Sequence, residues 1–153
     1  MSSDRGGGGK ALSVDASIRT LLLLMPRMVG RIKRSKIPDE LVGMNLAPRH
    51  LSLFAYLQFD GPLGVNELAE RLDVTPATVS LMVGELTRKG LLDRREDPTD
   101  RRRAVVSLSD THREAIDAWL SRGARAWRQA LEPLTADQRA LFIKTLKAYE
   151  SAL

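Results

Sequence analysis

The chain has 153 residues, no cysteine and two histidines, with a formal net charge of +5 and a pI near 10.0. This length suits one domain with a buried core, the lack of cysteine excludes a thiol redox sensor or a disulfide scaffold, and two histidines disfavour a zinc site. The basic balance favours a polyanionic partner, and we expect no metal or cofactor.

The N-terminal residues 1–13 include four consecutive glycines, Gly6 to Gly9. This composition predicts a flexible tail, and contact of its basic residues with phosphates is the less favoured alternative. The apolar run from Leu21 to Met25 is too short for a membrane span and comes too late for a secretory signal. We therefore expect a cytoplasmic protein.

A first helix is expected to begin with Asp15 as its cap and to run to about Ser35, with a kink at Pro26. Its polar side ends in basic residues that include Arg31, and these either reach phosphates or form an ordinary solvated helix end. Its apolar face is formed by Ile18, Leu21, Leu22, Met25, Val29 and Ile32.

A second helix is expected from Pro48 to about Phe59, after a loop and before a turn at residues 60–64. His50 lies near the start of this helix and is a candidate ligand contact. A lone histidine on a helix is more often a surface or packing residue, and we favour that interpretation.

The next stretch predicts two helices joined by a tight turn: a short helix at residues 65–72 and a longer one from Thr75 to Lys89. Thr75 is a good N-cap, and Pro76 suits the first helical position because its missing N–H costs nothing there. Gly90, just past the end, suits the left-handed conformation that terminates a helix.

Helical spacing divides this longer helix into two faces. The stripe expected in the core is Val79, Met82, Val83 and Leu86. The residues of the free face are Thr75, Ala77, Thr78, Leu81, Gly84 and Arg88. Small and hydroxyl side chains suit close approach to DNA bases, although an ordinary exposed helix is equally consistent with this segment alone.

A charged ribbon follows, with a turn from Asp97 to Asp100 and then an apolar strand from Ala104 to Leu108. A hairpin tip with several arginines can enter the narrow minor groove of DNA. The two acids argue against a simple polyanion clamp, and we expect one of them to orient an arginine through a bidentate pair. A solvated hairpin with weak surface salt bridges is the less favoured alternative. The arginines are Arg94, Arg95, Arg101, Arg102 and Arg103.

Two amphipathic helices are expected after the ribbon. The first is capped at Ser109, Asp110 or Thr111, of which Thr111 forms a capping box with Glu114, and it runs to about residue 131. The second opens with a capping box of Thr135 and Gln138 and runs to about residue 152.

The two helices, charged ribbon and strand of residues 65–108 together have the outline of a winged helix-turn-helix. The terminal helices lie outside it, so their apolar faces need a partner. A symmetric homodimer is the natural solution. The residues expected to be partly buried between subunits are Leu21, Met25, Leu141, Phe142 and Leu146.

Four segments, residues 68–72, 75–79, 86–91 and 95–102, resemble the MarR family of bacterial transcriptional regulators. The wing pattern Asp-Pro-x-Asp-Arg-Arg, followed by an apolar strand ending Ser-Leu-Ser, is the most specific of them. The resemblance implies a mainly α fold with a small β wing, that is, a winged helix-turn-helix with N- and C-terminal dimerisation helices. It also implies a homodimer that represses genes at palindromic sites of double-stranded DNA and releases them when a small molecule binds.

The resemblance assigns roles to individual residues. Arg102 matches the wing arginine that enters the minor groove, and Asp100 matches the acid that orients it. The residues expected to contact DNA are Thr75, Pro76, Ala77, Thr78, Ser80, Leu81, Arg88, Arg101, Arg102 and Arg103. A reversible effector is expected near Arg31, His50 or Trp119.

Three positions depart from the family pattern. Leu81 stands where a polar or basic reader is common, which puts guanine readout in doubt and favours contact with thymine methyl groups. Ala47 replaces the usual hydroxyl cap before the second helix, so we expect that helix start to fray. His112 stands where a glycine is common, so we expect different packing after the wing.

We expect residues 14–152 to form a single domain, with the winged helix-turn-helix at 47–109 and dimerisation helices at 14–46 and 110–153. The function expected is a ligand-responsive repressor that binds an inverted repeat. The alternative is a winged-helix module that binds protein or RNA without operator specificity. An enzyme is not expected, because the sequence has no nucleophile–base pair, phosphate-binding glycine loop or metal spacing.

Overall fold

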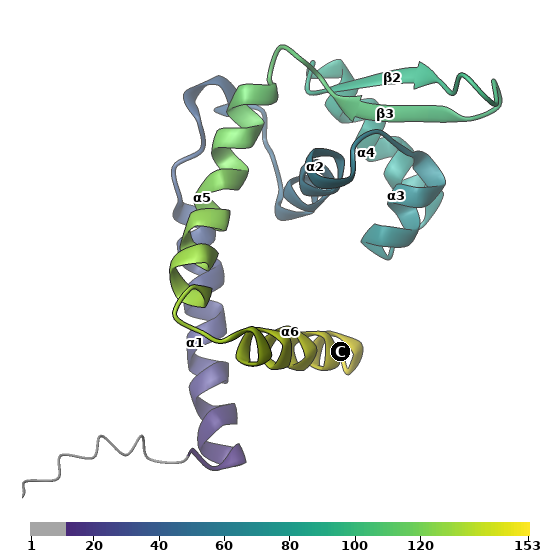
Figure 1. The fold of residues 1–153 in the computed structure, drawn as a ribbon. Helices are drawn as coiled ribbons and strands as arrows, with labels where there is room; N and C mark the ends of the chain where they lie inside the picture. Colours follow the sequence, from purple (N-terminus) through teal and green to yellow (C-terminus); the bar gives the residue numbers. More distant parts are fainter. Residues whose placement is uncertain (1–11) are drawn as a thin grey trace, which may run out of the picture. The chain divides into compact units, whose positions relative to one another are not determined.

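The computed structural model describes residues 12–153 (Figure 1), and these fall into two units, residues 12–36 and 37–153. The first unit holds helix α1, Val14–Arg34, which begins after Ser13 because the Ser13 hydroxyl accepts from the backbone N–H of Ala16. The expectation that Asp15 caps this helix is wrong: Ser13 is extended and caps it, whereas Asp15 lies inside the first turn. Residues 1–11 of the expected tail lie outside the described residues.

The second unit is mainly helical with a small antiparallel sheet, as expected. In chain order its elements are the 3-10 helix η1 Asp39–Leu41, α2 Pro48–Asp60, β1 Leu63–Gly64, α3 Val65–Leu72, α4 Pro76–Arg88, β2 Leu92–Glu96, β3 Ala104–Leu108, α5 Arg113–Leu131 and α6 Ala136–Ser151. The strand order is β1-β3-β2, with Leu92 opposite Leu108 and Glu96 opposite Ala104 in the hairpin. Strand β1 lies where the sequence predicted only a turn, because its partner β3 is distant in the chain.

The core of this unit lies between α2, α3, α4 and the sheet, and Ile116 of α5 closes it. The predicted stripe of α4 is confirmed, since all four of its members are buried. Leu86 is fully buried, as are Phe54 of α2 and Val106 of β3. Each such side chain contributes about 1.5–3 kcal/mol through its removal from water, so this core holds α4 in place.

Both ends of α4 have the predicted form. Thr75 accepts from the backbone N–H of Thr78 at 3.2 Å, which caps the helix start. At the other end, Gly90 has a φ of 75°, its N–H donates to the Thr87 carbonyl, and the N–H of Leu91 donates to the Leu86 carbonyl at 2.9 Å. The helix therefore ends abruptly and sends the chain directly into β2.

The two C-terminal helices begin differently from each other. The predicted cap of α5 at residues 109–111 is wrong, because His112 is the N-cap and its Nδ1–H donates to the Gly90 carbonyl at 2.9 Å. The sequence predicted different packing at His112, and the structure shows it as this hydrogen bond to the residue that follows α4. The capping box of α6 is confirmed, with Thr135 and Gln138 exchanging bonds. None of the described helices is both long and apolar enough to cross a lipid bilayer.

Candidate nucleic-acid interface

The first turn of α4 exposes short side chains. Pro76, Ala77 and Thr78 are exposed, and the hydroxyls of Thr75 and Thr78 lie 2.9 Å apart. One turn on, Leu81 is 76% exposed and Ser80 is exposed beside it. The exposed free face thus sits directly opposite the buried stripe, which presents it away from the core.

The wing is the hairpin of β2 and β3, and two acidic residues, Asp97 and Asp100, hold the turn at its tip. Asp97 Oδ1 accepts from the backbone N–H of Thr99 at 2.9 Å and from its hydroxyl at 2.7 Å, and these bonds lower the pKa of Asp97. Asp100 Oδ1 accepts from the backbone N–H of Arg102 at 3.0 Å, and the Asp100 carbonyl accepts from the N–H of Arg103. Both carboxylates therefore shape the backbone of the turn.

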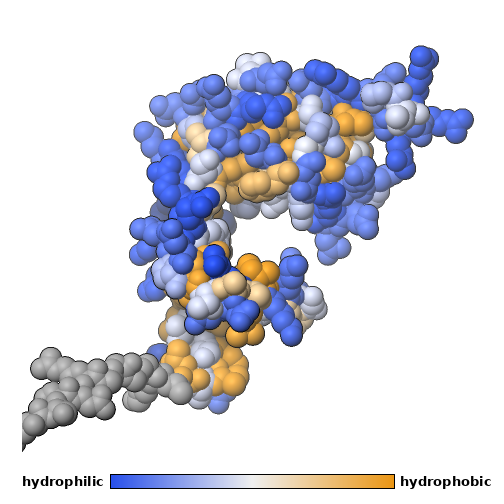
Figure 2. Space-filling model, viewed as in Figure 1, coloured by the Kyte–Doolittle hydropathy of each residue, from blue (hydrophilic) through white to orange (hydrophobic). Residues whose placement is uncertain are grey.

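The expected side-chain pair between Asp100 and an arginine is absent: no ion pair among the described residues joins them. The carboxylate is already engaged by the backbone N–H of Arg102, so it orients that residue through the turn. Arg101, Arg102 and Arg103 are all exposed at the tip. Figure 2 shows the tip of the β2–β3 hairpin as a mainly hydrophilic projection.

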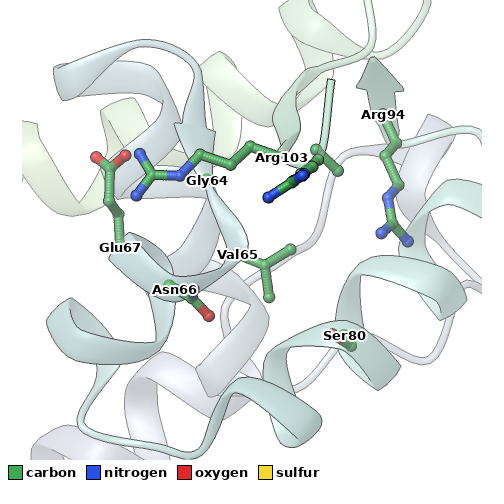
Figure 3. A pocket seen from close by; sticks show the side chains of 9 residues that line it. Gly64, Val65, Asn66, Glu67, Ser80, Arg94 and Arg103 are labelled. Atoms are coloured by element: carbon green, nitrogen blue, oxygen red, sulfur yellow. The ribbon is translucent and has the colours of Figure 1, made fainter. Parts of the chain in front are cut away.

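A cavity of about 220 Å³ lies between the wing and α4, the recognition helix of the expected helix-turn-helix. Its lining brings together Ser80 of α4 and the wing residues Arg102 and Arg103, all three of which the sequence placed at the DNA surface. Figure 3 shows Asn66 and Glu67, from the start of α3, on one side and Arg94 and Ser80 on the other. Sequence reasoning missed the α3 residues, because the signal is their proximity across the fold.

His50 is 1% exposed and has a structural role at the start of α2. Its Nδ1 accepts from the backbone N–H of Ala47 at 3.0 Å, so this nitrogen is unprotonated and Nε2 carries the proton. The imidazole thus supplies the half of a capping box that the third helical residue contributes, whereas no side chain caps the first-turn N–H groups of α2, and the expected fraying at Ala47 stays a prediction. Burial lowers the pKa of His50, opposed by the nearby carboxylate of Glu85 and assisted by Arg49 and Lys89.

Lys89 connects the loop before α2 to the C-terminal end of α4. Its Nζ donates to the Met44 carbonyl at 2.6 Å and to Glu85 Oε1 at 2.7 Å. The loop before α2 and the C-terminal end of α4 are thereby joined by a half-buried ammonium group. No sequence signal pointed to this contact, which spans 45 positions.

The remaining effector candidates fall in different units. Trp119 of α5 is half-buried, with its ring 6.4 Å from that of Phe54. Arg31 is exposed on α1 in the first unit. The effector set therefore stays a prediction.

Comparison with known proteins gives a consistent assignment. The model of the MarR family matches residues 43–103. The HTH-type transcriptional repressor MdtR of Bacillus subtilis is 31% identical over 98 residues, which are 64% of this chain and 63% of MdtR. The chain thus spans less than two thirds of that relative's length.

Solved structures share the fold over nearly the whole chain. A probable transcriptional regulator from Pseudomonas aeruginosa is 26% identical, with a TM-score of 0.58 over 90% of this chain and 99% of that one. MepR of S. aureus, solved as a DNA complex, is 24% identical, with a TM-score of 0.58 over 86% and 96% of the two chains. Residues 43–103 thus match the MarR family, and the fold of the chain is similar to that of these solved regulators over most of its length.

Proposed function

We propose that the protein is a homodimeric transcriptional regulator that binds an inverted repeat in double-stranded DNA and represses transcription until a small molecule binds it. The observation that carries the proposal is the cavity where Ser80 of the recognition helix meets Arg94, Arg102 and Arg103 of the wing. A DNA duplex bound across helix and wing brings phosphates to the guanidinium groups of Arg94 and Arg103 and its minor groove to that of Arg102. The name of MdtR as a transcriptional repressor supports the same function.

In this proposal the two parts of the surface have separate tasks. The exposed face of α4 enters the major groove, where Thr75, Ala77, Thr78 and Leu81 meet base edges. Arg102 enters the minor groove and is placed there by the turn that Asp100 holds. Pro76 and Ser80 complete the groove-reading set of α4, and the remaining contacts, to phosphates, come from Arg88, Arg101 and Arg103.

The homodimer is proposed from the terminal helices. None of the residues of α1 and α6, all of them described, is buried. Large apolar side chains stand exposed there, including Leu21 at 50% and Leu141 at 64%, and Figure 2 shows apolar residues at the surface of the segment carrying α6. A second copy of the chain covers such faces symmetrically and sets two recognition helices about one helical turn of DNA apart.

Titration of the protein with duplex DNA at increasing salt tests the proposal. The logarithm of the affinity should fall steeply and linearly with the logarithm of the salt concentration, with a slope that counts the phosphates contacted. A sequence selected from a random duplex pool should be palindromic and should compete far better than a shuffled duplex. Equal binding of RNA or of shuffled DNA would instead support a winged-helix module without operator specificity.

A further inference from the structure

Leu81 stands out on α4 because it is a large apolar side chain on the face that points away from the core. It is 76% exposed, whereas Val79, Met82 and Leu86 are at most 5% exposed. A single exposed leucine is ordinary on a protein surface. This one lies in the middle of the face that the proposed function places against base edges, between Ala77 and Gly84 on the same helical stripe.

The two threonine hydroxyls in the turn before Leu81 have little capacity left for reading bases. Thr75 Oγ1 accepts from the Thr78 N–H, and the two hydroxyls share a hydrogen bond of 2.9 Å. Only one of their two hydroxyl protons therefore remains to donate outward. Neither side chain offers the two parallel bonds by which arginine reads guanine or asparagine reads adenine.

Gly84, one turn beyond Leu81, adds no side chain to this part of the helix surface. A Cβ added at Gly84 would lie 3.6 Å from Nη1 of Arg88, so the arginine side chain extends back along the helix beside it. The Arg88 guanidinium is then placed to neutralise a phosphate, while Leu81 remains the side chain that meets the base edge. The contact available to it is apolar.

We infer that Leu81 is a specificity-determining residue that recognises thymine through its C5-methyl group in the major groove. The inference rests on the proposed function and names the base that function requires at this position. Thymine is the DNA base that presents a methyl group in that groove. Removing this methyl should therefore weaken binding at one or two positions in each half-site.

Deoxyuridine provides the test, because it differs from thymine only by the missing methyl group. Each thymine of a duplex selected from a random pool is replaced in turn, and the dissociation constant is measured at one fixed salt concentration. At the Leu81 positions each replacement should weaken binding by the wild-type protein about fourfold, the value of one buried methyl group. Leu81→Ala should bind the thymine and deoxyuridine duplexes equally, and Leu81→Met, which keeps an apolar side chain, should restore part of the difference.

Phe59→Ala is the matched control, since Phe59 is 77% exposed but lies on α2. It should keep the full preference for thymine. The inference is overturned if every replacement changes wild-type affinity by less than about twofold, or if Leu81→Ala keeps the wild-type ratio. In either case salt-dependent operator binding remains and the proposed function stands, whereas failure to bind any duplex overturns both. Because Leu81 is exposed, its variants should melt at the wild-type temperature, which separates lost contact from lost folding.

Discussion

Helices α4 and α6 are similar in length and both carry apolar residues, yet only α4 buries its apolar face within the chain. Helix α4 buries Val79, Met82, Val83 and Leu86 against its own core and exposes its opposite face. Helix α6 has no buried residue along its described length, although Leu141, Ile143 and Leu146 lie on it. An apolar pattern therefore indicates that a helix face is buried against something, and only the fold shows whether the same chain or a second molecule buries it.

The largest expected effect comes from the covered face of α4. Leu86→Ala should lower the free energy of unfolding by about 2–5 kcal/mol, because it opens a cavity in a fully packed core. Urea denaturation measures this loss. Leu81→Ala, on the exposed face of the same helix, is the control and should change stability by no more than about 0.5 kcal/mol. Equal losses for the two variants would contradict the assignment of the faces.

A substitution on the exposed apolar face of α6 should change the dimerisation of the protein. Leu141→Asp places a charge among exposed apolar side chains and should weaken the dimer by roughly 2 kcal/mol or more, as at other interface hot spots. Sedimentation at several concentrations measures the shift from dimer to monomer. Phe59→Asp alters an even more exposed apolar residue outside the terminal helices and should leave the dimer intact. A wild-type chain that sediments as a well-folded monomer contradicts this use of α6.

The buried end of α2 should show a dependence on pH. Because burial lowers the pKa of His50, the unfolded chain binds a proton more readily than the folded chain. The stability gained from the neutral imidazole is complete above the ordinary value of 6.5 and is lost as pH falls from there through the folded pKa. Urea midpoints measured across this range should decline toward acid.

His50→Gln provides the control for that decline, since a glutamine at this helix position can accept from the Ala47 N–H without titrating. The decline below 6.5 should be smaller in this variant. An unchanged decline would assign the pH dependence to other groups.

The smallest expected effect concerns the acid of the wing tip. Asp100→Asn keeps an oxygen that accepts from the Arg102 N–H, whereas Asp100→Ala removes it. The alanine variant should weaken operator binding by roughly 0.5–1.5 kcal/mol, the value of one hydrogen bond, although it removes a negative charge. The asparagine variant should bind as well as or better than wild type. Tighter binding by Asp100→Ala would show that Asp100 only repels phosphate.

Local patterns predicted the helices well because their causes are local. The core stripe of α4, its cap at Thr75 and the capping box of α6 depend on residues within a few positions of one another. The family resemblance likewise located the wing. These features carried most of the fold and the outline of the candidate site.

The sequence-based predictions failed where contacts between residues far apart in the chain determine the structure. Helix α5 starts at Arg113 instead of after a hydroxyl cap, because His112 bonds to Gly90 and the side chain of Arg113 donates to the Leu108 carbonyl. Strand β1 forms because β3 supplies its partner from far along the chain, with Leu63 opposite Val106 and Gly64 opposite Val105. The cavity between α3, α4 and the wing belongs to the same class of feature.

The wing was misread for a different reason. Sequence reasoning gave Asp100 a side-chain partner, whereas the structure gives it the backbone N–H of Arg102. Short acidic side chains in turns compete for nearby backbone donors, and this preference is stronger than pairing with a long, exposed arginine.

The measurement that tests the central claim most directly is the affinity of Arg102→Ala for the selected operator and for an unrelated duplex of equal length, over a range of salt. If Arg102 enters the minor groove, the loss should be about 1–3 kcal/mol on the operator and smaller on unrelated DNA. Arg102→Lys should not restore binding, because lysine lacks the planar guanidinium group. An equal loss on both duplexes, with the salt slope reduced by about one charge, would show that Arg102 only neutralises a phosphate and that the wing reads no sequence.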